Sequence, residues 1–262
     1  MKQDKLTPEV VDSQPYTMSS LVGKLVLALV RESDYAHAGE AEAIDLVFEH
    51  LPRGESLRVL DVGCGIGGTA QYVTGRGWGH VTGIDIDPDN VATAKARHPG
   101  ISFICTDAAT MGAALRAELV DPVPGFDVIY ALNAFFLFAR QARALTQMRT
   151  LARPGARLAI FDYVERVGRA DGGADLRSSL NDASMAPMLA ASGWRLLRTD
   201  SYDAHYLRWY EELVQRITAK RDAVVAASSE GFFEYVLGRY SQTRDDVKAG
   251  RLGGATFYAE AV

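Results

Sequence analysis

The hydrophobic and polar positions of this chain alternate between short apolar runs and longer stretches with helical spacing. The runs at 57–62, 81–85, 101–105, 126–130 and 157–161 are rich in branched apolar residues, as in strands buried on both faces. Between these runs, apolar residues recur at the three- and four-residue intervals of amphipathic helices. Strands and helices in this order predict an α/β fold with a doubly wound, Rossmann-like sheet.

The C-terminal part of the chain predicts two further strands, at 194–198 and 255–262, which bring the sheet to seven. About 50 residues separate these two strands, whereas a hairpin needs roughly two to five. The long insertion carries aromatic residues at helical spacing, including Tyr206 and Tyr210. We therefore expect a mostly parallel sheet with an antiparallel last strand, and a helical lid between strands six and seven.

The N-terminal part predicts two helices, at about 18–30 and 41–51, ahead of the first strand. Residues 1 to about 15 are polar, and a glycine-rich loop is expected at 166–174. The expected organisation is a cap, a two-segment core and a lid: 1–54 for the cap, 55–203 with 254–262 for the core, and 204–253 for the lid.

The stretch 57–68, LRVLDVGCGIGG, places four glycines directly after the first strand and before a helix. Glycines at such a turn let the backbone approach a nucleotide-type cofactor closely. The spacing also satisfies the dinucleotide fingerprint, which by itself is weak evidence. Asp61, two residues before Gly63, would repel a pyrophosphate and attract a cationic ligand instead.

Two more carboxylates follow the next strands. Asp85 ends the second strand, 22 residues after Gly63, and suits a ligand of both ribose hydroxyls. That spacing serves NAD equally well. Asp107 follows the third strand and is a candidate acceptor for an adenine amino group, with a simple turn-capping role as the alternative.

Taken together, LDVGCGIGG, GIDID and TDAA resemble three ordered motifs of the class I S-adenosylmethionine-dependent methyltransferases. The resemblance covers roughly residues 55–165 and is closest to the small-molecule type, such as the phosphoethanolamine and ubiquinone-pathway enzymes. It implies S-adenosylmethionine as cofactor and S-adenosylhomocysteine as product. The expected cofactor-binding residues are Asp61, Gly63, Cys64, Gly65, Gly67, Asp85, Ile86, Asp107, Ala108 and Ala131.

Candidates for catalysis and for substrate binding lie on the cap, after the fourth strand, at the end of the fifth strand and on the lid. We expect His37, His205 and Tyr163 to be catalytic, and Tyr35, Asn133, Phe136, Tyr206 and Tyr210 to bind substrate. For His37 the alternatives stay open: a base, a part of the cofactor entry, or a surface residue near a helix start. Aromatic residues at helical spacing are also common in protein cores.

The phosphoethanolamine enzymes carry an Asp and, four residues later, a His in the loop after the fourth strand. Asn133 and Leu137 stand at the matching positions here, which argues against that substrate. We expect methyl transfer to a small, apolar or aromatic metabolite, plausibly in specialised metabolism, with the O, N or C acceptor unresolved. The alternatives are a cofactor-binding enzyme with a non-methylating reaction such as a cyclisation, and an NAD-dependent oxidoreductase.

Composition limits the partners. The net charge is −5 and no Lys/Arg-rich run occurs, so we expect no nucleic acid partner. The two cysteines do not have metal-ligand spacing, and we expect no metal and a reduced, cytoplasmic protein. The apolar run 21–30 contains Lys24 and is too short to span a bilayer. As a helix it is instead a candidate for packing in a homodimer.

Overall fold

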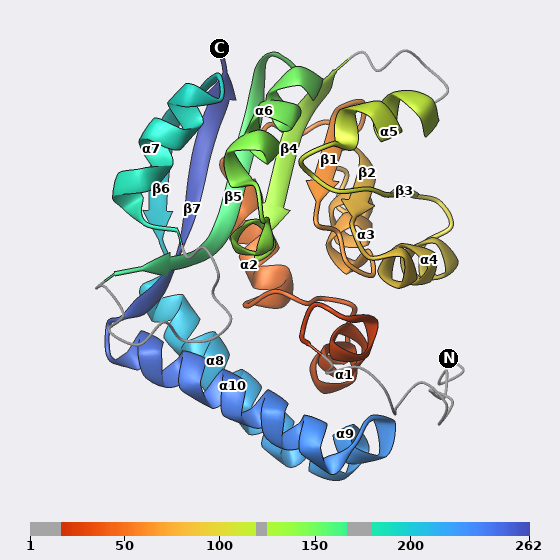
Figure 1. The fold of residues 1–262 in the computed structure, drawn as a ribbon, viewed down its shortest axis with the longest axis vertical. Helices are drawn as coiled ribbons and strands as arrows, with labels where there is room; N and C mark the ends of the chain where they lie inside the picture. The colour runs from red at the N-terminus through yellow and green to blue at the C-terminus, as the bar shows by residue number, and fades with distance from the viewer. Residues whose placement is uncertain (1–16, 119–124, 167–179) are drawn as a thin grey trace.

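The computed structural model describes residues 17–118, 125–166 and 180–262. A seven-stranded sheet with the order β3-β2-β1-β4-β5-β7-β6 forms its centre (Figure 1). Its strands are β1 (Arg58–Val62), β2 (His80–Asp85), β3 (Ser102–Cys105), β4 (Phe126–Leu132), β5 (Ala152–Glu165), β6 (Trp194–Ser201) and β7 (Leu252–Ala261). Strands β1 to β5 pair in parallel, and β7 is antiparallel to both β5 and β6. The predicted mostly parallel sheet with an antiparallel last strand is confirmed.

Successive residues of each central strand point to opposite faces of the sheet, and each face has its own apolar cluster. On β1, Val59 packs with the cluster that includes α2, α3 and α4, whereas Leu60 packs with α5, α6 and α7. Both side chains are fully buried. Burial on both faces explains why the strands read as continuous apolar runs.

The helices surround this sheet, and several begin at a side-chain cap. Asp87 accepts from the backbone N–H groups of Asp89 and Asn90, and Pro88 stands at the first position of α4. Ser20 caps α1, which therefore begins three residues later than the sequence predicts. The helices are α1 (Leu21–Arg31), α2 (Glu40–Phe48), α3 (Gly68–Gly75), α4 (Pro88–Arg97), α5 (Met111–Glu118), α6 (Gln141–Leu151), α7 (Asp182–Ala191), α8 (Asp203–Ala219), α9 (Arg221–Ala227) and α10 (Glu230–Lys248), with a 3-10 turn at Phe135–Leu137.

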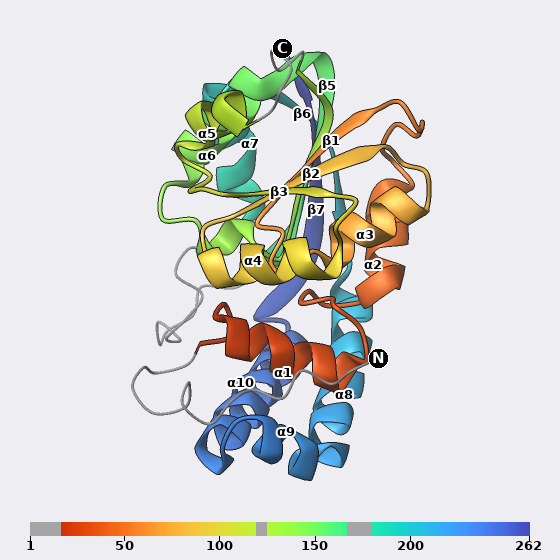
Figure 2. The ribbon, with the colours of Figure 1, turned by 90° about the vertical axis from the view of Figure 1, so that its right-hand side faces the viewer.

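Four helices, α1 and α8 to α10, lie beyond the carboxyl ends of the parallel strands, and α1 lies between the sheet and α9 (Figure 2). Ion pairs join α1 to its neighbours: Glu40 accepts from Arg31 at 3.0 Å and from Arg216 of α8 at 2.8 Å. The cap region and the inserted helices thus cover the edge where ligands bind in open α/β sheets.

The last strand begins at Leu252, earlier than the sequence predicts, because two glycines hide its start. A Cβ on Gly254 would overlap the ring of Tyr206, so this strand position accepts only glycine beneath α8. The expected loop at 166–174 falls almost wholly outside the described residues, as does the polar segment at 1–15.

Candidate functional site

The glycine turn between β1 and α3 is held open by backbone contacts to β2. The N–H groups of Gly63 and Cys64 both donate to the carbonyl of Ile84, at 2.8 and 2.9 Å. Gly63 has a φ of +88°, and a Cβ there would meet the Cβ of Ala134 at 2.5 Å. Only glycine fits this position, where the turn passes under the loop after β4.

Asp85, at the end of β2, supports the turn and faces the ligand side at the same time. Its Oδ2 accepts from the N–H of Gly65 at 2.9 Å, and its Oδ1 accepts from the N–H of Asp87 at 3.0 Å. Each carboxylate oxygen has a second lone pair, so both can still accept from a ligand. A diol such as a ribose matches that acceptor pair.

Asp107 follows β3 and is held by two donors. Its Oδ1 accepts from the N–H of Ala109 at 2.8 Å, and its Oδ2 accepts from Arg140 at 2.7 Å. The Ala109 hydrogen bond is the main cause that lowers the pKa of Asp107. The side chain is therefore an ionised acceptor fixed at the rim of the site.

Asp61 lies at the end of β1 and is 2% exposed. Burial raises the pKa of its carboxyl to about 7, although the nearby hydroxyl of Tyr130 lowers it; the charge of Asp85 adds a smaller rise. Its Oδ2 has no hydrogen-bond partner among the described residues. A buried acceptor without a partner is costly, and a cationic ligand group would satisfy it.

Two neighbouring cavities, which share Lys24, Ala36, Gly63 and Asn133, lie over these strand ends. The larger, of about 410 Å³, is lined by Gly63, Asp85, Ile86, Asp107 and Ala108 among the predicted cofactor residues. The smaller, of about 30 Å³, is lined by Asp61, Gly63, Cys64 and Gly65. The structure thus brings together the predicted residues of all three motifs, while Gly67 and Ala131 line neither cavity.

The lining of the larger cavity away from the carboxylates combines apolar and aromatic side chains with Arg239. Leu27 of α1, Phe136 from the loop after β4, Tyr163 of β5 and Tyr240 of α10 belong to it. The hydroxyl of Tyr163 meets that of Tyr210 in a buried contact, so Tyr210 lies behind the wall. Burial raises the pKa of Tyr163, which is therefore protonated at neutral pH.

Asn133 lines both cavities and connects three parts of the fold. Its Oδ1 accepts from the N–H of Ala38 at 3.0 Å, and its Nδ2 donates to the hydroxyl of Tyr206 at 3.0 Å and to Asp162 at 3.4 Å. Its φ of +46° is one that asparagine tolerates better than most residues. Asp162 also accepts from the N–H of Phe136. Burial raises the pKa of its carboxyl to about 7.

His37 lines the smaller cavity, and both of its ring nitrogens have partners. Nδ1 lies 3.0 Å from the carbonyl of Ala38, and Nε2 lies 3.1 Å from the hydroxyl of Thr69. Because a carbonyl only accepts, Nδ1 donates and Nε2 accepts. Burial lowers the pKa of His37 to about 4, so the ring is neutral. Its catalytic role stays a prediction.

Several predicted residues lie outside both cavities. His205 contacts the rings of Tyr202 and Trp209, and Tyr35 packs against His37 and Tyr72. Tyr206 is fully buried and contacts two lining residues: it accepts a hydrogen bond from Asn133 and packs edge-to-face against Tyr163. The sequence pattern places these residues on the right elements but cannot tell which helical face turns towards the ligand.

The sequence interpretation missed other lining residues, notably Lys24, Leu27 and Asn90. Asn90 is 1% exposed, and its Oδ1 has no partner among the described residues, while its Nδ2 donates to the carbonyl of Ser19 at 3.3 Å. The signal for Lys24 was present: it is a single cation inside an apolar helix. Asn90 carries no such signal in the sequence.

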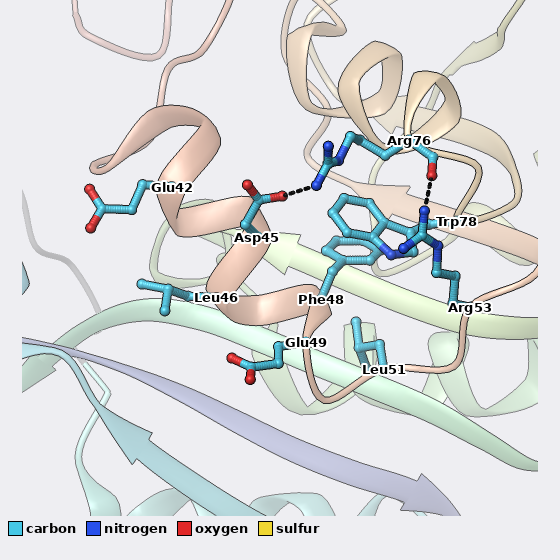
Figure 3. A pocket seen from close by; sticks show the side chains of 9 residues that line it. All are labelled: Glu42, Asp45, Leu46, Phe48, Glu49, Leu51, Arg53, Arg76 and Trp78. Carbon is cyan, nitrogen blue, oxygen red and sulfur yellow. Dashed lines mark hydrogen bonds and ion pairs between the residues drawn. The ribbon is translucent and has the colours of Figure 1, made fainter.

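A further cavity, of about 700 Å³, lies on α2 away from these strand ends (Figure 3). Both of its arginines have partners within it: Arg76 lies 3.6 Å from Asp45, and Arg53 donates to the Arg76 carbonyl at 2.9 Å. Phe48 and Trp78 stack with ring centroids 4.9 Å apart. This cavity contains none of the predicted site residues.

Among the described residues, none of the helices combines the length and apolar character that crossing a membrane requires. No group of three metal-binding side chains is present among the residues described.

Comparisons with known proteins agree with this geometry. Residues 60–160 match the family model described as a methyltransferase domain. This part of the chain is therefore similar to the methyltransferase domains that use S-adenosylmethionine as their cofactor. A probable phthiotriol/phenolphthiotriol dimycocerosates methyltransferase 2 of Mycobacterium ulcerans is 29% identical over 154 residues. The match covers 58% of this chain and 52% of the relative, so the chain spans about half the length of that protein.

Solved structures share the fold. A phosphoethanolamine N-methyltransferase 2 of Haemonchus contortus, in complex with phosphomonomethylethanolamine and S-adenosylhomocysteine, superposes with a TM-score of 0.79 at 16% identity. The superposition covers 94% of this chain and 58% of the Haemonchus contortus chain. The cyclase SpnF superposes with a TM-score of 0.71 at 21% identity, covering 95% of this chain and 98% of its own. At such identities the likeness concerns the fold alone.

The residues present fit the cofactor of this class. Asp85 has free lone pairs for a ribose, Asp107 is an ionised acceptor, and Asp61 has a buried oxygen without a partner. Ile86 is 68% exposed and lines the cavity between them, where an apolar surface can face an adenine ring. Because the turn consists largely of glycines, no Cβ covers its backbone at the centre.

Proposed function

We propose that this protein transfers a methyl group from S-adenosylmethionine to a small metabolite with an apolar or aromatic body. The observation that carries the proposal is the larger cavity. One end is lined by carboxylates at the tips of β2 and β3, and the other by aromatic side chains from three separate elements. A single cavity with two such ends can align a cofactor and a small acceptor.

The cofactor, when bound, supplies a methyl group already activated on a sulfonium. In this proposal Asp85 binds the ribose, Asp107 the adenine amino group, and Asp61 the cationic end. Phe136 and Tyr240 exclude water from the acceptor and orient it. We assign the lid role to α8, α9 and α10, because α10 contributes a wall of the cavity.

This arrangement relies on alignment more than on proton transfer. Tyr163 is protonated at neutral pH and orients an acceptor through its hydroxyl. His37 is neutral, and both of its nitrogens are engaged. An acceptor that is already nucleophilic, such as a phenolate, an amine or an electron-rich carbon, needs no base from the protein.

The test uses methyl-labelled S-adenosylmethionine and a panel of small phenols, amines, fatty acids and polyketide-like compounds. Transfer of label to one class of acceptor, together with a matching mass increase, is the expected result. Binding of S-adenosylhomocysteine with no transfer to any acceptor would count against methyl transfer.

The second candidate is a cofactor-dependent cyclisation without methyl transfer. One observation favours it: in the described part of the chain, the aromatic end of the larger cavity carries no His, Asp or Glu. Such a wall suits a reaction that needs a shaped space rather than a base. A product of unchanged mass, formed while the cofactor stays intact, would select this candidate.

A further inference from the structure

Lys24 is the charge that interrupts the apolar sequence of α1, and it points into the site rather than to solvent. Its side chain lines both cavities. Its Nζ lies 3.3 Å from the position that a Cβ on Gly65 would occupy. The ammonium therefore lies over the centre of the glycine turn, and no ion pair joins it to another residue of the described chain.

The smaller cavity has five charged or titratable side chains in its lining: Lys24, Asp34, His37, Asp61 and Cys64. Burial raises the pKa of the Cys64 thiol, which is therefore neutral. Asp34 is paired with Arg97 and with His98. His37 has partners at both nitrogens. What remains is one carboxylate with an unpartnered buried oxygen, on Asp61, and one ammonium, on Lys24.

This pair of charges is complementary to a zwitterion. The cofactor of this class ends in an amino acid group, which carries an ammonium and a carboxylate on the same carbon. Asp61 accepts a hydrogen bond from the ammonium, and opposite charges within hydrogen-bond distance attract strongly inside a protein. The carboxylate needs a cation nearby, and Lys24 is the cation that the two cavities share near the glycine turn.

We propose that Lys24 binds the carboxylate of the cofactor's methionine part and thereby anchors α1 over the glycine turn. The proposal rests on the cofactor class assigned above. Leu27 lies one turn further along α1, on the same face, and lines the larger cavity. Cofactor binding through Lys24 therefore also fixes a wall of the acceptor site.

The connections of α1 extend this effect to the inserted helices. Arg31 and Arg216 share Glu40, and Lys220 donates to Glu32 at the end of α1. A bound carboxylate at Lys24 holds a helix that is already tied to α8 and to its junction with α9. Lys24 is thus a positioning residue for the acceptor site as well as a ligand of the cofactor.

The experiment compares three ligands by isothermal titration calorimetry. These are S-adenosylhomocysteine, its decarboxylated analogue, which keeps the amine, and methylthioadenosine, which lacks the whole amino acid. They are measured with the native protein, Lys24→Met, Lys24→Arg and the control Lys95→Met, whose side chain is exposed on α4. Thermal melting of the free proteins checks that each variant folds.

In the native protein we expect S-adenosylhomocysteine to bind about 10- to 100-fold more tightly than its decarboxylated analogue, as for one charge-assisted contact. Lys24→Met should reduce that ratio to about twofold and leave methylthioadenosine binding unchanged. Lys24→Arg should keep most of the ratio, and Lys95→Met all of it.

Equal weakening of all three ligands by Lys24→Met would overturn the proposal, because it would show a structural role only. An unchanged ratio would overturn it too. Failure of the native protein to bind any of the three ligands would instead contradict the cofactor site itself, so the two failures are distinguishable.

Discussion

The two ends of the larger cavity are built in different ways. The end lined by carboxylates, called the cofactor end after the function proposed above, comes from short segments directly after β1, β2 and β3. Its acids and glycines lie next to the strands that position them. The aromatic end takes one or two residues from each of α1, the loop after β4, β5 and α10. Those elements are brought together only by the tertiary fold.

Because of this difference, the cofactor end can be recognised from local sequence, whereas the aromatic end can vary with the packing of distant helices. Parallel strands bring their carboxyl ends to one edge, so Asp85 and Asp107 meet wherever such a sheet forms. The aromatic end depends on the way α8 to α10 pack over the sheet. It can therefore change with substitutions that leave the cofactor end intact, which suits a fold that serves many acceptors.

The largest effect is expected at the cofactor end. Asp85→Ala removes two acceptors from the ligand and also releases the N–H of Gly65. We expect S-adenosylhomocysteine to bind about 100-fold more weakly, measured by calorimetry. Asp89→Ala, an exposed acid on α4, is the matched control and should bind normally. Normal binding by Asp85→Ala would remove the main support for the cofactor end.

The next effect concerns the residue that joins the two ends. Asn133→Ala leaves the N–H of Ala38 and the hydroxyl of Tyr206 without their partner. We expect the free energy of unfolding to fall by about 2 kcal/mol, measured by urea denaturation. Leu137→Ala, 44% exposed on the same loop, should change it little. Equal stability of the two variants would show that the ends are not coupled here.

A third prediction uses pH. The pKa of Asp61 in the free protein is about 7, so its carboxyl loses its proton between about pH 6 and pH 8. The ionised form attracts a cationic ligand group, so the affinity for S-adenosylhomocysteine should rise with pH by about tenfold over this range. Asp61→Asn should flatten the profile. A native affinity that falls as pH rises would contradict this assignment.

The smallest effect is expected at the aromatic end. Tyr163→Phe removes a hydroxyl that meets Tyr210 and faces the cavity. We expect kcat/KM for the acceptor found in the labelling assay to fall about fivefold, as for one neutral hydrogen bond. Affinity for S-adenosylhomocysteine should stay within about twofold. Tyr235→Phe, on α10 outside both cavity linings, should change neither value.

Much of the fold and of the cofactor end could be predicted because the information is local. The apolar run before Gly63 specifies a buried strand. The position of Asp85 at the end of β2 can likewise be predicted from its neighbours in the sequence alone. The start of β7 could not be found, because Gly253 and Gly254 interrupt the apolar pattern, and only the fold shows that Asp203 lies against Gly253 and Tyr206 against Gly254. The ring orientation of His37 was equally hidden. Lys24 stands out in the sequence as a cation inside an apolar helix, but only the fold shows that it lines the cavities.

The sequence by itself determined the order of strands and helices, the parallel sheet with its antiparallel last strand, and the three carboxylates at the strand tips. Strand periodicity and glycine turns act over a few residues, so they leave a readable pattern. Only the tertiary structure decided which faces of α1, α8 and α10 turn towards the ligand. That choice is made by packing between elements up to two hundred residues apart, as in the contact of Arg216 with Glu40 or of Lys220 with Glu32.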